Sequence, residues 1–111
     1  MSTVTRFHWT GHAQVGYQVT IPIPVHDHDA NGFPTNRNLS ADTLAVVVID
    51  SAAASVTASV AYDATSGFEH VANVTITAAN ADLAGRHTID LYIGANPEPV
   101  HPGWSFTMEP A

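Results

Sequence analysis

Residues 15–25 read Val15-Gly16-Tyr17-Gln18-Val19-Thr20-Ile21-Pro22-Ile23-Pro24-Val25 and alternate between apolar and other side chains without a break. Because successive side chains of a strand point to opposite faces, this alternation predicts a β-strand with one apolar face. Pro22 and Pro24 share the other face, so the two N–H groups that they lack belong to the same edge of the strand. The stretch therefore predicts a half-buried strand at the margin of a sheet.

The rest of the chain predicts further strands and no convincing helix. Residues 44–50 are apolar at both parities, which favours a central strand that is covered on both sides. Residues 79–84 allow at most one helical turn, closed by Gly85. Strand-like alternation also occurs at residues 4–10 (with Phe7 and Trp9 on one face), 55–62, 68–77, 88–93 and 104–109. About seven strands with turns between them predict an all-β domain of two packed antiparallel sheets, spanning residues 1–111 without a domain boundary.

The loop that follows the strand predicted at residues 15–25 contains a candidate calcium motif. Asp27, Asp29 and Asn31, followed by Gly32, match the first half of an EF-hand loop, in which alternate oxygen ligands precede a sharp turn. The twelfth position, where a bidentate glutamate is required, is Asn38. The alternative is a turn in which these side chains cap backbone N–H groups.

A pair of histidines in the same region is a candidate transition-metal site. His26 and His28 are two residues apart, so a strand would place both imidazoles on one face, a spacing that suits zinc, copper or iron. A third ligand would have to come from another part of the chain: His8, His12, His70, His87 or His101. Solvent-facing histidines without a metal are the alternative, and we expect no bound cofactor.

The composition argues against several classes of function. The 111 residues contain no cysteine and no lysine, and the formal charge is −7. An acidic chain whose only fixed cations are three arginines is not expected to bind nucleic-acid phosphates or anionic membranes. Only 12% of the residues are charged, which is low for a free-standing enzyme and favours a surface that is covered by neighbouring copies. Codon usage is the alternative reason for this composition.

No pattern of catalytic residues is present in the sequence. None of the serines lies in a G-x-S-x-G motif, there is no glycine-rich phosphate loop, and the acidic residues are scattered. A sugar-stacking platform remains an alternative, although the parity of most aromatic residues favours the core. The aromatic candidates for such a platform are Trp9, Tyr17, Tyr62, Tyr92 and Trp104.

From about Gly16 onward the chain resembles the immunoglobulin-like modules of tailed-phage virion proteins, such as capsid decoration proteins and the N-terminal domains of baseplate upper proteins. The resemblance is carried by residues 17–21, 44–50, 74–77 and 79–85. In such modules the last of these segments is commonly followed by a tyrosine within an A-G-x-Y pattern. In this sequence Ala84-Gly85-Arg86 is followed by His87 instead. The resemblance implies an immunoglobulin-like antiparallel β-sandwich and a non-catalytic role in a virion.

We therefore expect a virion structural protein, assembled in the host cytoplasm, that decorates the outer surface of the capsid in many copies. Its expected partners are the major capsid protein and neighbouring copies of itself, with no nucleic acid and no membrane. A tail, neck or baseplate module is the alternative within that class, and a metal-dependent or carbohydrate-binding module lies outside it. The interface candidates are Phe7, Trp9, Pro97, Pro99 and Trp104.

Overall fold

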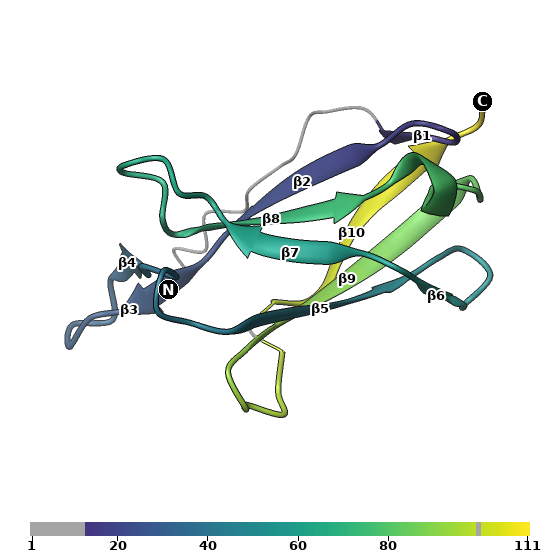
Figure 1. The fold of residues 1–111 in the computed structure, drawn as a ribbon. Coiled ribbons are helices and arrows are strands. Elements are labelled where there is room, and N and C mark those ends of the chain that lie inside the picture. Colours follow the sequence, from purple (N-terminus) through teal and green to yellow (C-terminus); the bar gives the residue numbers. More distant parts are fainter. Residues whose placement is uncertain (1–12, 100) are drawn as a thin grey trace.

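The computed structural model describes residues 13–99 and 101–111, and these residues form two packed layers of β-strands (Figure 1). The described strands are β1 (Ala13–Gln14), β2 (Val19–Pro24), β3 (His26–His28), β4 (Pro34–Asn36), β5 (Leu44–Ile49), β6 (Ser55–Val56), β7 (Ser59–Tyr62), β8 (Val71–Ile76), β9 (Gly85–Ile93) and β10 (His101–Glu109). A 3-10 turn, η1 (Ala78–Asn80), precedes β9.

Each layer of the sandwich is one sheet. The larger sheet has the strand order β1-β10-β9-β5-β6, and the smaller has the order β2-β8-β7. The strands pair antiparallel except β1 and β10, which run parallel. Strands β3 and β4 form a separate hairpin at one end of the molecule (Figure 1). The sequence-based prediction of an all-β protein with two packed sheets is confirmed.

The core lies between the two sheets and is built from alternate residues of their strands. Each fully buried isoleucine, leucine or valine contributes about 1.5–3 kcal/mol through removal of apolar surface from water. His87, a buried polar residue on β9, places its Nδ1 3.1 Å from the Gly85 carbonyl oxygen and stacks against Phe106. The largest fully buried apolar side chains are Ile21, Ile23, Leu39, Val48, Val74, Ile76, Ile89, Leu91 and Met108.

Strand β2 confirms the interpretation of the quoted stretch in part. Val19, Ile21 and Ile23 are buried, and β2 is an edge strand, as its two prolines require. The strand begins at Val19 rather than Val15, because Gly16 has a φ of +89° and its N–H donates to the carbonyl of Ala81. The segment between β1 and β2 is a turn that leads from one sheet to the other, and Tyr17 is 65% exposed on it.

The prediction that residues 44–50 form a strand covered on both sides is wrong. Strand β5 packs one face against the core through Leu44, Val46 and Val48, whereas Ala45 and Val47 on its other face are exposed, Val47 by 41%. The reason is that the larger sheet is an outer layer of a two-layer sandwich, and no described segment lies over its outer face.

Other predicted boundaries shift where the chain changes sheet or turns. The segment 55–62 is two strands, because the chain leaves the larger sheet after β6 and enters the smaller one at β7. Phe68 and His70 lie in the turn before β8, and Gly85 begins β9 instead of closing a helical turn. The predicted strand at residues 4–10 lies outside the described residues. Within the described part of the chain, no helix has the length and apolarity needed to cross a membrane.

Candidate binding surface at the hairpin end

The β3–β4 hairpin projects from the end of the sandwich where β2 finishes (Figure 1). His26, Asp27 and His28 pair with Asn36, Thr35 and Pro34, and all six residues are exposed. The loop that the sequence predicts after residue 25 therefore contains a two-stranded sheet. An isolated hairpin of this length is marginal in water, so its shape depends on contacts at its turn and at its base.

The turn of the hairpin is held by the side chain of Asp29. Its Oδ1 accepts hydrogen bonds from the backbone N–H groups of Asn31 at 2.9 Å and Phe33 at 3.0 Å. The backbone closes the same turn, because the Asp29 N–H donates to the Phe33 carbonyl and Gly32 adopts a φ of +82°. Asp29 thus performs the capping role that the sequence pattern offered as the alternative to calcium binding.

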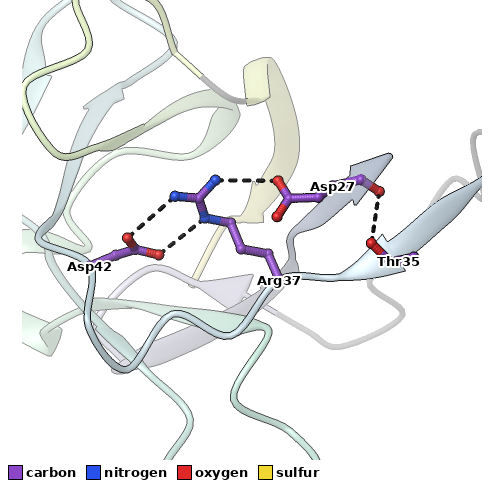
Figure 2. Close-up of polar contacts among 4 residues, drawn as sticks. All are labelled: Asp27, Thr35, Arg37 and Asp42. Atoms are coloured by element: carbon purple, nitrogen blue, oxygen red, sulfur yellow. Dashed lines mark hydrogen bonds and ion pairs between the residues drawn. The ribbon is translucent and has the colours of Figure 1, made fainter. Parts of the chain in front are cut away.

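Arg37 holds the base of the hairpin by contacting two carboxylates (Figure 2). Its Nε donates to Oδ2 of Asp42 at 3.1 Å and its Nη2 donates to Oδ1 of Asp42 at 3.3 Å. Its Nη1 donates to Oδ1 of Asp27 at 3.2 Å, so one guanidinium joins strand β3 to the segment that leads into β5. The planar fork of arginine suits this bidentate contact, which a lysine ammonium does not reproduce.

The charge environment of Arg37 stabilises its charged form. The hydrogen bonds to Asp42 are the largest cause of a raised pKa of the guanidinium. Burial opposes this increase, and the hydrogen bond to Asp27 adds a smaller contribution to it. Because all three side chains remain partly exposed to solvent, each ion pair stabilises the fold by about 0.2–1 kcal/mol. The contacts therefore define the hairpin's geometry more than they contribute to the overall stability.

The hairpin base also packs on the turn before β8. The N–H groups of Val25 and Leu39 donate to the carbonyls of His70 and Glu69, at 2.8 and 2.9 Å, and the Leu39 side chain is completely buried. The His26 and His70 rings lie 6.0 Å apart, so the structure brings one of the proposed third histidines close to the His26/His28 pair.

Two exposed aromatic side chains occur at this end. Phe33, in the hairpin turn, is 58% exposed, and Phe68, in the turn that contacts the hairpin base, is 53% exposed. Large aromatic residues on an ordered support contribute strongly to protein interfaces, because they bury much area and lose little conformational entropy. We take Phe33, Phe68 and the supporting hairpin as the candidate binding surface, and call it the hairpin end.

The candidate metal ligands are placed in different environments. Asp27 faces Arg37, and Asp29 accepts its hydrogen bonds from the turn, whereas His26 and His28 occupy the opposite side of β3 from Asp27. Among residues 13–99 and 101–111 no group of three or more histidine, aspartate or glutamate side chains is arranged to hold a metal ion. Asn38, at the position of the missing ligand, accepts from the Ser40 N–H.

The remaining interface candidates are distributed over the molecule. Phe7 and Trp9 lie outside the described residues. Pro97 is exposed and Pro99 is half-buried in the segment between β9 and β10, and Trp104 packs half-buried against the core. The aromatic side chains proposed for sugar stacking do not form one face, since Tyr17 is exposed in the β1–β2 turn while Tyr62 packs against the core.

Sequence reasoning missed the roles of Arg37 and of the two exposed phenylalanines. The signal for Arg37 is its rarity, because it is one of three cations in an acidic chain and lies between Asp27 and Asp42. The signal for Phe33 is an aromatic residue between Gly32 and Pro34, in a turn where no core position is expected.

Comparison with known proteins establishes the fold. No family model matches the sequence, and a search of curated proteins finds no match. Six chains of known structure match the fold, among them the crystal structure of the Lin-41 filamin domain, which has a TM-score of 0.51 and 18% sequence identity over 90% of this chain and 82% of that chain. None of these findings bears on the resemblance to phage virion modules. The chain has the immunoglobulin-like β-sandwich fold that the sequence predicted.

Proposed function

We propose that this chain is a non-catalytic structural protein of a virion, and specifically a decoration protein that binds the outer surface of the capsid shell in many copies. The hairpin end carries the proposal. It presents Phe33 on a support that Arg37 and Asp29 hold in one geometry, which lowers the entropic cost of binding. In this role the hairpin end contacts the shell.

The electrostatics of the chain agree with a position on the outside of a particle. A formal charge of −7 opposes contact with packaged nucleic acid, and the absence of lysine leaves three arginines as fixed cations. Of these, Arg37 is engaged by Asp27 and Asp42 within the chain. The affinity for the shell therefore comes from apolar and neutral polar contacts more than from charge pairs, and it depends weakly on salt.

A co-pelleting experiment tests this role. Empty shells are assembled from the major capsid protein of the genome that encodes the chain, mixed with the purified protein and pelleted. We expect saturable binding at a fixed ratio of this chain to capsid subunits. Phe33→Ser should weaken binding more than tenfold, which corresponds to about 1.4 kcal/mol.

The matched control is Tyr17→Ser. Tyr17 is an exposed aromatic residue at the opposite end of β2 from the hairpin, and its replacement should leave binding unchanged. Shells that bind none of the wild-type protein would reject the decoration role. An equal loss from both variants would reject the hairpin end as the contact.

A further inference from the structure

The two margins of the sandwich differ in how their strand edges end. At one margin β2 carries Pro22 and Pro24, which offer no N–H to a further strand. At the other margin β5 and β7 contact each other, and β6 pairs with β5 only at Val48 and Ile49 (Figure 1). In the described residues no strand pairs with the outer side of residues 44–47.

Hydrogen-bond parity shows which backbone groups this margin presents. The Gly94 N–H donates to the Thr43 carbonyl at 2.7 Å, in register with the β5–β9 ladder. Because bonded pairs alternate along antiparallel strands, Ala45 and Val47 also bond to β9. Leu44 and Val46 consequently direct their N–H and C=O groups away from β9, toward the open margin.

The core is incompletely covered at this same margin. Leu44 and Val46 of β5 and Val60 and Tyr62 of β7 are half-buried and pack against the core. Val56 and Ala58, between these strands, are half-buried too. A further strand fits such a surface, because it forms hydrogen bonds with the unpaired backbone groups and covers the partly exposed apolar side chains.

Residues 4–10 of the chain have the chemistry of such a strand. They alternate, with Phe7 and Trp9 on one face and Arg6 and His8 on the other. Residues 1–12 contain Arg6 and no acidic residue, whereas residues 13–111 contain two arginines and all ten acidic residues. Residues 1–12 are therefore complementary in charge to the acidic remainder of a second copy.

We propose that residues 4–10 of one copy add as an antiparallel strand to the outer edge of β5 in a neighbouring copy. Phe7 and Trp9 cover Leu44, Val46, Val60 and Tyr62, and Arg6 lies on the outer face of the added strand. The added strand comes from another copy. Residue 13 begins β1 at the opposite margin of the larger sheet, and β10 and β9 lie between β1 and β5. The three residues from 10 to 13 span about 10 Å, which is too short to cross these strands within one chain. This contact joins copies to one another and does not depend on what the hairpin end binds.

The first test measures association of the full-length chain by sedimentation velocity over a range of concentrations, with no shells present. We expect reversible association that Arg6→Glu weakens at least tenfold. The control is Arg86→Glu, which changes the net charge by the same amount at an exposed position near the start of β9. It should leave association unchanged. A chain that stays monomeric, or equal effects of the two variants, would overturn the proposal.

The second test uses a synthetic peptide of residues 2–12 as a competitor for the full-length chain. In an antiparallel pair, the residues on the Leu44 and Val46 face of the added strand are those whose N–H groups point at β5. N-methylation of Phe7 and Trp9 should therefore abolish the peptide's ability to dissociate the assembly. N-methylation of Arg6 and His8 should leave it intact, and any other ranking would overturn the inference.

Discussion

The hairpin end and the middle of the sandwich are stabilised by different forces. The hairpin residues 26–36 are exposed and are held by polar contacts of Asp29 and Arg37, whereas the middle of β9 is held by fully buried apolar side chains. Solvated ion pairs contribute little free energy, and buried aliphatic groups contribute much. Polar contacts thus set the shape of the binding surface, while apolar burial sets the stability of the scaffold.

The largest expected effect lies in the core. Leu91→Ala on β9 should lower the free energy of unfolding by about 2–5 kcal/mol, because it removes buried methyl groups and leaves a cavity. Val47→Ala, on the exposed face of β5, is the control and should cost less than about 1 kcal/mol. Urea unfolding of both variants measures the difference. Similar losses would contradict the assignment of β5's outer face to solvent.

The next effect concerns the close approach of the β5–β6 turn to the start of β9. Gly85 has a φ of +112°, and a Cβ there would lie 2.7 Å from Cβ of Ser51. Gly85→Ala should cost about 1–3 kcal/mol from backbone strain, and more from the overlap. Gly94→Ala, where φ is +62° and no atom lies within 4 Å of the new Cβ, should cost about 1 kcal/mol. Thermal unfolding of the two variants measures both losses of stability. Equal losses would show that the contact with Ser51 relaxes freely.

A smaller global effect is expected at the hairpin end. Arg37→Ala should lower the free energy of unfolding by about 1 kcal/mol or less, because its ion pairs are partly exposed to solvent. Amide exchange at Gly32 and Phe33 should nevertheless accelerate several-fold, with β9 unchanged. Arg37→Lys should not restore protection, since lysine lacks the fork. Unchanged exchange in Arg37→Ala would show that Asp29 alone holds the hairpin.

The smallest effect depends on pH. The backbone N–H of Thr65 donates to Asp63 at 2.9 Å and lowers the pKa of that carboxyl, with further hydrogen bonds from the side chains of Thr65 and Asn73. Because the folded-state pKa lies below the unfolded value of about 3.9, the carboxylate stabilises the fold above that pH and loses this effect as pH falls through the folded pKa. Asp63→Asn should therefore be slightly less stable than wild type at neutral pH and equal to it in strong acid. Urea midpoints at both pH values check this, and a difference that persists in acid would assign it to something other than charge.

Particular segments show how far the sequence predicts the fold. The alternation of residues 15–25 predicted both the buried face of β2 and its edge position, because side-chain parity and the missing proline N–H groups are local properties, but it did not predict that the strand begins at Val19. Residues 55–62 alternate equally well, yet the chain changes sheet within them. Alternation specifies which face is apolar but not which strand lies alongside.

The candidate binding surface was less predictable. Asp29 was recognised as a possible capping residue, since an aspartate followed by Asn-Gly is a local turn signal. The contacts of Arg37 with Asp27 and Asp42, and the approach of His70 to His26, depend on how the hairpin folds back on the turn before β8. These pairings are non-local, so residue spacing did not predict them.

The sequence by itself determined an all-β chain, an edge strand within residues 15–25, a turn signal at Asp29 and Gly32, and an acidic composition without lysine. These follow from φ restrictions, side-chain parity and charge, each a property of residues near one another in the chain. Only the tertiary structure decided that Val47 faces solvent, that Gly85 meets Ser51, and that no strand among residues 13–99 and 101–111 pairs with the outer side of residues 44–47. Those features depend on which strands become neighbours, and that choice is made by the burial of the whole core rather than by any one segment.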